Sequence, residues 1–230
     1  MEREPARSLV ALDEVTRRLR RDCPWDREQD ERSIVPHTVE EAYELADAAA
    51  AEDDEKLLDE LGDVLFQVLF LSLLLEERSA GSLAEVAEAM SAKLVRRHPH
   101  VFGEAQADSA GEVLRNWDRI KREVEGRGSE TEPFADVPEN LPALLYARKI
   151  QRRAASAGLG GLEPARDAAD PSTPGSEAED VLGSNSREAA EQWLGEALFG
   201  LVDVARRLRV DPELALRAAA QRFRERTASD

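Results

Sequence analysis

The stretch that most constrains the fold runs from Val64 to Leu75 and is apolar at every position except Gln67 and Ser72. Its 12 residues fall short of the roughly 20 that a membrane-spanning helix needs, so we expect a helix buried on most of its sides. Ala, Leu, Glu and Arg dominate the rest of the chain, and aromatic residues make up only 5 %. Because these are strong helix formers, the predicted fold class is all-α.

The charge of the chain constrains its partners. A formal net charge of −17 repels polyanions and anionic membranes, so we expect no polynucleotide partner and no membrane. A small anionic substrate can still bind if divalent cations bridge it to acidic side chains. Cys23 is the only cysteine, which rules out an intrachain disulfide, and the first residues lack the apolar core of a signal peptide. The expected location is cytoplasmic.

Helical spacing of apolar residues predicts helices at 6–21, 37–51, 53–78, 83–97, 109–126, 142–157, 187–208 and 212–227. Thr38 is the expected N-cap of the second helix, just after Pro36, and residues 22–26 are expected as a loop. Residues 158–187 differ in composition, because 12 of these 30 residues are Gly, Pro or Ser. We expect a flexible linker there.

A faint internal repeat suggests two copies of one helical unit. The sequence LGDVLF at 61–66 resembles LGEALF at 194–199, and KLVRR at 93–97 resembles RFRER at 222–226, at a similar separation. Chance similarity between Leu- and Ala-rich helices is the alternative explanation. The predicted organisation is a catalytic helical domain at 1–157, the linker at 158–187 and a degenerate C-terminal repeat at 188–230.

The residues best suited to a chemical function are a set of carboxylates on the second and third predicted helices: Glu40, Glu41, Glu44, Glu60 and Asp63. Glu41 and Glu44 are three residues apart and share a helix face, and so do Glu60 and Asp63. A short turn makes the two helices antiparallel, so the two pairs can face each other. Carboxylate oxygens suit Mg²⁺ or Mn²⁺, whereas a solvated acidic surface is the simpler interpretation. Spacing alone leaves both open.

Two other metal chemistries are disfavoured. A di-iron carboxylate bundle needs a His three residues after a Glu, and none of His37, His98 and His100 stands at that spacing. A zinc hydrolase site is disfavoured because the chain has one Cys and no His-rich ligand spacing.

A second group of residues could contact a substrate: Lys93, Arg96, Arg97, Trp117, Lys121 and Trp25. The three cations on one helical turn could hold phosphates, although cations at a helix C-terminus are also favoured by the helix dipole. Trp117 and Lys121 are four residues apart, and Trp25 lies in a polar segment. An indole can stack on a nucleobase, but it often simply packs.

Four motifs together resemble the MazG family of nucleoside triphosphate pyrophosphohydrolases. They are CPWD at 23–26, EEAYE at 40–44, ELGD at 60–63 and KLVRRHPHVF at 93–102. The resemblance covers residues 8–157 well and continues weakly to the C-terminus, where the family often carries a second copy. It implies an all-α helical bundle that forms a homodimer in which two chains build the active sites. It also implies Mg²⁺-dependent hydrolysis of a nucleoside triphosphate to monophosphate and pyrophosphate.

The resemblance also implies roles for individual residues. Glu41, Glu44, Glu60 and Asp63 would be the metal ligands, and Glu40 would orient or deprotonate the attacking water. The phosphate-binding candidates are Lys93, Arg96, Arg97 and Lys121.

The sequence departs from the family pattern at a few positions. Asp30 and Glu31 stand where the family tends to have Thr and His, and His37 stands where Tyr is usual, which leaves the substrate preference open. In the second copy, Trp193 and Glu196 align with Glu60 and Asp63. We therefore expect that copy to be catalytically inactive and to serve dimerisation or stability.

Two alternatives of other classes stay open at the level of sequence. One is a non-catalytic helical module that binds nucleotides or a protein partner. The departures from the family pattern at Asp30, Glu31 and His37 favour this alternative. The other is a structural oligomerisation protein, whose melting temperature would not respond to Mg²⁺ or Mn²⁺.

Overall fold

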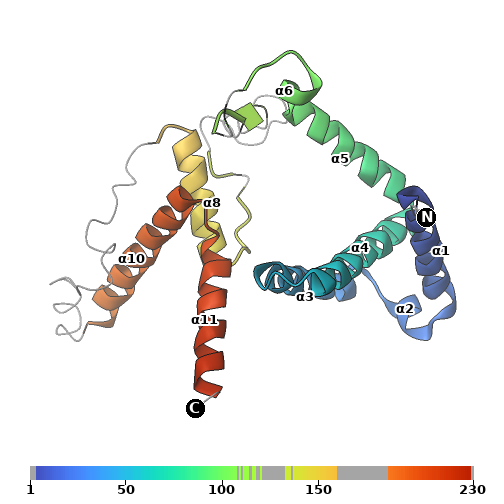
Figure 1. Ribbon diagram of the computed structural model, residues 1–230, viewed down its shortest axis with the longest axis horizontal. Coiled ribbons are helices and arrows are strands. Elements are labelled where there is room, and N and C mark those ends of the chain that lie inside the picture. The colour runs from blue at the N-terminus through green and yellow to red at the C-terminus, as the bar shows by residue number, and fades with distance from the viewer. Residues whose placement is uncertain are drawn as a thin grey trace. The chain divides into compact units, whose positions relative to one another are not determined.

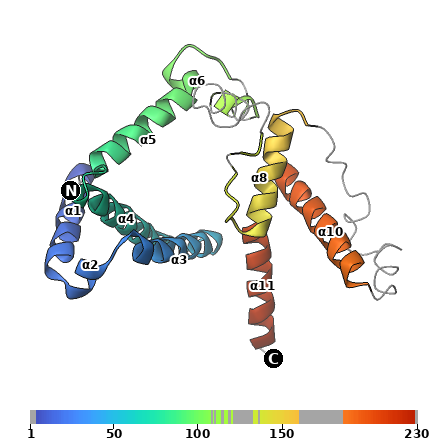
Figure 2. The same cartoon turned by 180° about the vertical axis from the view of Figure 1, so that it is seen from behind.

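The computed structural model describes residues 4–107, 109, 111–113, 116–117, 120, 133–135, 137–159 and 186–228. These residues form helices and no strand, which confirms the all-α class (Figures 1 and 2). The chain divides into two compact units, Met1–Arg96 and Arg97–Asp230. The helices are α1 (Pro5–Asp22), α2 (Pro24–Glu28), α3 (Glu31–Ala50), α4 (Asp54–Glu77), α5 (Leu83–Arg97), α6 (Pro99–Phe102), α8 (Ala143–Ser156), α10 (Arg187–Leu208) and α11 (Pro212–Ala228).

The predicted helix boundaries agree closely for α1, α4, α5, α8, α10 and α11. The predicted helix at 109–126 and the predicted linker at 158–187 lie largely outside the described residues. The segment at 22–26, predicted as a loop, contains the start of α2 instead. Pro24 opens this short helix, because a proline at the first helical position loses no hydrogen bond and has its φ angle preset for a helix.

The start of α3 differs from the prediction by about two turns. Asp30, rather than Thr38, is the N-cap: its carboxylate accepts from the Ser33 amide at 2.9 Å, and the Ser33 hydroxyl accepts from the Asp30 amide at 2.9 Å. This capping box starts the helix early, so Pro36 lies inside it. The proline removes one helical hydrogen bond, and burial of the Ile34 side chain in the same turn helps to hold the helix.

Helices α3 and α4 form an antiparallel pair around a tight turn at 51–53. Asp53 caps α4 by accepting from the Lys56 amide at 3.0 Å, and Glu52 adopts a positive φ of 55°. Ile34 and Phe70, each 18 residues from Glu52, lie together in the core with Leu74. Residues equally far from Glu52 therefore lie opposite each other in this pair.

The apolar stretch that opened the sequence analysis supplies most of this core. Phe70 is fully buried, and Leu69, Leu73 and Leu74 are at most 8 % exposed. Val68, on another side of α4, is 39 % exposed. The prediction of a helix buried on most of its sides is therefore confirmed, and Val68 is the one exposed residue of the stretch.

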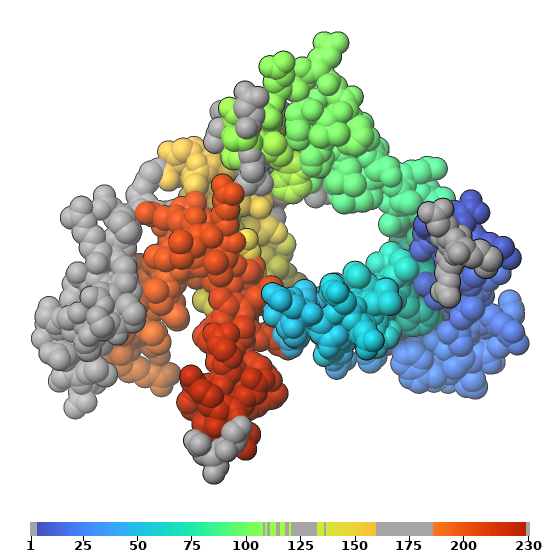
Figure 3. Space-filling model, viewed as in Figure 1, coloured from blue at the N-terminus to red at the C-terminus, as the bar shows by residue number. Residues whose placement is uncertain are grey.

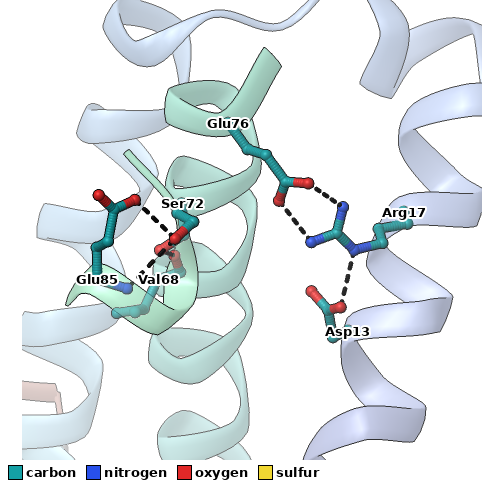
Figure 4. Close-up of polar contacts among 7 residues, drawn as sticks. Asp13, Arg17, Val68, Ser72, Glu76 and Glu85 are labelled. Atoms are coloured by element: carbon teal, nitrogen blue, oxygen red, sulfur yellow. Dashed lines mark hydrogen bonds and ion pairs between the residues drawn. The ribbon is translucent and has the colours of Figure 1, made fainter. Parts of the chain in front are cut away.

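Arginines of α1 attach that helix to the C-terminal end of α4. The Arg17 guanidinium donates to both carboxylate oxygens of Glu76, at 3.1 and 2.6 Å, and to Asp13 of its own helix (Figure 4). Arg20 donates to Glu77 and also to the backbone carbonyls of Asp26 and Gln29. Arg20 therefore holds the α2 segment, which carries Trp25, against the end of α4.

The second unit is built on α8, which packs against α10 and α11. The Gln151 amide donates to the Phe199 carbonyl at 2.7 Å, and Arg148 pairs with Asp211. Asp203 is 4 % exposed and pairs with Arg206 and Arg207 of its own helix, both at 2.6 Å. Helix α11 projects beyond its two neighbours (Figure 3). Phe223 on this helix is 61 % exposed. Helix α8, expected in the first domain, thus contacts the C-terminal helices.

Within the described ranges, none of the helices combines the length and apolar character that crossing a bilayer requires.

Candidate metal centre

Three carboxylates converge where α3 faces the first half of α4. Glu41, Glu60 and Asp63 each offer an oxygen, and these oxygens lie within 4.8 Å of one another. The register of the helix pair explains the convergence, because Glu41 and Asp63 are each 11 residues from Glu52, and Glu44 and Glu60 are each 8 residues from it. The prediction that the two acidic pairs face each other across antiparallel helices agrees with this geometry.

The carboxylates destabilise one another's charged forms. Glu60 is 5 % exposed, and burial raises the pKa of its carboxyl, with the negative charge of Glu44 adding to the effect. The pKa of Glu41 is raised by partial burial and then by the charges of Asp63 and Glu44. Buried anions without compensation are costly, so this arrangement favours a cation between the two helices.

The donor set fits a hard divalent cation. All three groups present carboxylate oxygens, the ligand type that Mg²⁺, Mn²⁺ and Ca²⁺ prefer. Two oxygens on opposite sides of a bound Mg²⁺ are about 4 Å apart, so the observed spacing needs only small side-chain movements. Glu44 lies outside the group of three but acts on Glu60 through its charge, as a fourth ligand would.

Lys56 is a residue of this centre that the sequence analysis missed. Its ammonium lies 3.8 Å from a carboxylate oxygen of Glu60, one helical turn away, and lowers the pKa of that carboxyl against the raising effects. It is the only Lys or Arg between residues 33 and 77 of the sequence. The signal that could have found it is the Lys–Glu spacing of four residues in a segment otherwise free of cations.

Glu40 is not among the three converging carboxylates. Its side chain is 64 % exposed, and a carboxylate oxygen lies 3.7 Å from Nδ1 of His37. The His37 ring in turn meets the Trp25 ring edge-on, with ring centroids 6.2 Å apart. Trp25 is 53 % exposed, so the structure brings a solvated indole to the α3 side of the carboxylates.

Lys93 and Arg96, two of the cationic candidates, do not lie near the carboxylates of their own unit. Lys93 and Arg96 lie near the far end of α5, which starts beyond the C-terminal end of α4 and leads away from the α3–α4 pair (Figures 1 and 2). Glu60 lies 17 residues before the end of α4, a separation of about 25 Å along the helix. Reaching the carboxylates from Lys93 or Arg96 therefore requires another chain or a rearrangement.

Arg97 and Trp117 form a pair in the second unit. The guanidinium carbon of Arg97 lies 4.7 Å from the centroid of the Trp117 ring, and Arg97 is only 6 % exposed. A cation–π contact of this kind fixes both side chains. Lys121, predicted beside Trp117, lies outside the described residues.

The predicted second copy shows no comparable centre among its described residues. Trp193 and Glu196 lie on α10, where a Trp offers no oxygen ligand, and the carboxylates of Glu41, Glu60 and Asp63 are the only close acidic group in the part of the chain that the structure describes. The segment before α10 at 160–185 is not among those residues.

An all-α protein with a carboxylate centre between antiparallel helices is typical of a metal-dependent hydrolase. Residues 29–102 match the model of the MazG nucleotide pyrophosphohydrolase domain. The chain is 39 % identical over 212 residues to a nucleoside triphosphate pyrophosphohydrolase of Escherichia coli K12, covering 89 % of this chain and 78 % of that protein. It is 37 % identical over 209 residues to a Thermotoga maritima protein named nucleoside triphosphate pyrophosphohydrolase/pyrophosphatase MazG, covering 89 % and 77 %.

A Mycolicibacterium smegmatis nucleoside triphosphate pyrophosphohydrolase is 35 % identical over 160 residues, which is 69 % of this chain and 49 % of that protein. The chain belongs to the MazG family of nucleotide pyrophosphohydrolases, which are hydrolases that act on acid anhydrides.

Proposed function

We propose that the protein hydrolyses a nucleoside triphosphate to the monophosphate and pyrophosphate, with Mg²⁺ as the preferred cation and Mn²⁺ as a substitute. The observation that carries this proposal is the convergence of Glu41, Glu60 and Asp63 within 4.8 Å, in a chain similar to proteins named for this activity. We propose these three residues and Glu44 as the metal ligands. When bound, the cation supplies positive charge to the phosphate oxygens and lowers the pKa of the attacking water.

The residues of the chain then have separate tasks. Glu40 is exposed and adjacent in sequence to Glu41, so its carboxylate is available to orient the water and accept its proton. Lys56 stands one turn from Glu60 and can pair with a phosphate oxygen once Glu60 is engaged by a cation. No covalent nucleophile is needed, because water attacks the α-phosphorus and pyrophosphate leaves with the bridging oxygen.

The remaining cations are proposed to act in a homodimer. Lys93, Arg96 and Lys121 would stabilise the charge on the leaving pyrophosphate from a second chain, and Arg97 would position Trp117 at the edge of the site. The resemblance to a family whose sites are built by two chains supports this assignment, as does the placement of α5 away from the carboxylates of its own chain. We propose a cytoplasmic enzyme without polynucleotide partners.

Incubation with individual triphosphates in the presence and absence of Mg²⁺ tests the proposal. We expect Mg²⁺-dependent release of equimolar monophosphate and pyrophosphate. Asp63→Asn should lower kcat by about a hundredfold or more, because it removes a charged metal ligand while keeping the side-chain shape. Glu196→Gln, at the aligned position of the second copy, is the matched control and should retain the wild-type rate. Orthophosphate as the sole product, or nucleotide binding without turnover, would overturn the proposal.

A further inference from the structure

Gln67 is a buried polar side chain that is not part of the carboxylate centre. It is 7 % exposed, and its Oε1 atom is fully buried without a hydrogen-bond partner in the structure. A buried amide oxygen that forms no hydrogen bond costs about 1–3 kcal/mol relative to an apolar side chain of similar shape. Gln67 also interrupts the apolar stretch of α4, where Leu or Met would pack at no such cost. Its presence therefore calls for a partner that binds to the protein.

The register of the helix pair places Gln67 beside the substrate side of the centre. Gln67 and His37 are each 15 residues from Glu52, so they lie opposite each other, four residues beyond the pairing of Glu41 with Asp63. Four residues correspond to about 6 Å along the helices. The next neighbour in this direction is Trp25, whose ring meets His37 and is half exposed. Along the α3–α4 pair the order is therefore carboxylates, then Gln67 and His37, with the indole against His37.

This order matches the order of groups in a nucleotide. The carboxylates hold the cation and the phosphates, the indole offers a face on which a base can stack, and the sugar lies between phosphate and base. The ribose hydroxyls are separated from the α-phosphorus by O5′, C5′ and the ring carbons, a distance of about one helical turn of 5.4 Å. A hydroxyl both donates and accepts, so it suits the Gln67 amide whichever way the amide group is turned.

We propose that Gln67, with His37 opposite it, forms the sugar subsite and discriminates nucleotides by a ribose hydroxyl. This inference rests on the proposed hydrolysis of nucleoside triphosphates. It adds that the enzyme recognises the sugar of its substrate. Because an amide left unpartnered disfavours an analogue that lacks the hydroxyl, the discrimination is expected to be about tenfold in kcat/KM.

The test compares the triphosphate that wild type cleaves best with its 2′-deoxy and 3′-deoxy analogues. Wild type should prefer the ribonucleotide over one of the two analogues by about tenfold, and Gln67→Met should bring that ratio close to one. Methionine keeps the length of the side chain and removes its polar atoms, so the variant should fold with an unchanged or higher Tm. Equal ratios in wild type and variant would overturn the inference, as would a wild type that cleaves all three equally.

Gln151→Met is the matched control, because Gln151 is also a buried glutamine with an unpartnered Oε1 but lies in the second unit. It should keep the wild-type ratio, and an equal change there would overturn the inference. Calorimetry with an α,β-methylene triphosphate and its deoxy analogues separates this inference from the proposed reaction. Binding that prefers the ribose form and depends on Gln67, together with no turnover of the parent triphosphate in Mg²⁺, would support the sugar subsite and overturn the proposed hydrolysis. A wild type that neither binds nor cleaves would overturn both.

Discussion

At the scale of single residues, Glu60 shows how the fold prepares the centre for a cation. It is 5 % exposed, next to Glu44 and Asp63, and its only described counter-charge within reach of an ion pair is Lys56 at 3.8 Å. Burial and like charges raise its pKa. The ionised form is therefore less favourable in the folded protein than in the unfolded chain, until a cation is bound.

This pKa shift predicts the sign of a stability change. A raised carboxyl pKa favours folding at low pH, and that contribution is lost as the pH rises through the shifted value. Glu60→Gln removes the cost of the buried charge, so the metal-free variant should melt above wild type near pH 8. The difference should vanish toward about pH 3, below the ordinary carboxyl pKa, where the wild-type carboxyl is neutral in both states.

Thermal melts in EDTA across this pH range check the prediction, with Glu196→Gln as a control that should show no pH-dependent difference from wild type. Addition of Mg²⁺ should raise the Tm of wild type more than that of Glu60→Gln, because a ligand bound only by the folded state stabilises it. If Glu60→Gln melted below wild type near pH 8 without metal, the ionised Glu60 side chain would not be destabilising the metal-free protein.

At the scale of elements, the start of α3 depends on one capping interaction. Asp30 and Ser33 exchange hydrogen bonds at 2.9 Å and begin the helix ahead of Pro36. Without this cap, the proline would be a favourable first residue of a shorter helix. The capping box therefore decides whether the turn that carries Ile34 and leads to His37 is helical.

Loss of this cap should weaken the protein measurably. Asp30→Ala removes the acceptor for the Ser33 amide and should lower the free energy of unfolding by about 1 kcal/mol. Asp30→Thr keeps a capping oxygen and should lose only a few tenths of that amount, about 0.3 kcal/mol. Urea denaturation monitored by circular dichroism measures both. Equal stability of Asp30→Ala and wild type would show that the first two turns of α3 do not depend on the cap.

At the scale of the whole molecule, the first unit exposes apolar side chains beside its carboxylates. On α4, Leu58 is 74 % exposed, Leu61 49 % and Val68 39 %. Neighbouring apolar side chains of this size, left in water on one helix, are typical of a surface that another chain covers. The cations of α5, which do not reach the carboxylates of their own chain, give a second physical reason for a dimer.

We therefore expect a homodimer in solution. Sedimentation equilibrium at micromolar concentration should give a mass of two chains, each of 25.5 kDa. Leu61→Glu places a charge on the exposed apolar side of α4, and it should shift the protein toward monomer and lower activity together. A monomeric wild type with full activity would contradict the prediction that two chains build each site.

The sequence by itself determined the helical class, most helix boundaries and the acidic residues of the centre. Helix-forming composition, apolar spacing and the three-residue separation of carboxylates are local properties, and local properties can be inferred from neighbouring residues. The start of α3 was mispredicted because the capping box outweighs the boundary signal of Pro36. Lys56 was missed because a single Lys on a helix has no distinctive pattern.

The sequence predicted that the two acidic pairs face each other, but only the tertiary structure fixed the individual contacts and the burial of each side chain. The pairing of Glu41 with Asp63 and of His37 with Gln67 follows from the register of two antiparallel helices, which the turn at 51–53 and the contact of Ile34 with Phe70 set together. Burial, which raises the pKa of Glu60 and isolates Oε1 of Gln67, is a property of packed neighbours and not of sequence spacing. The positions of Glu60 and Gln67 were visible in the sequence, but their energetic state came from the fold.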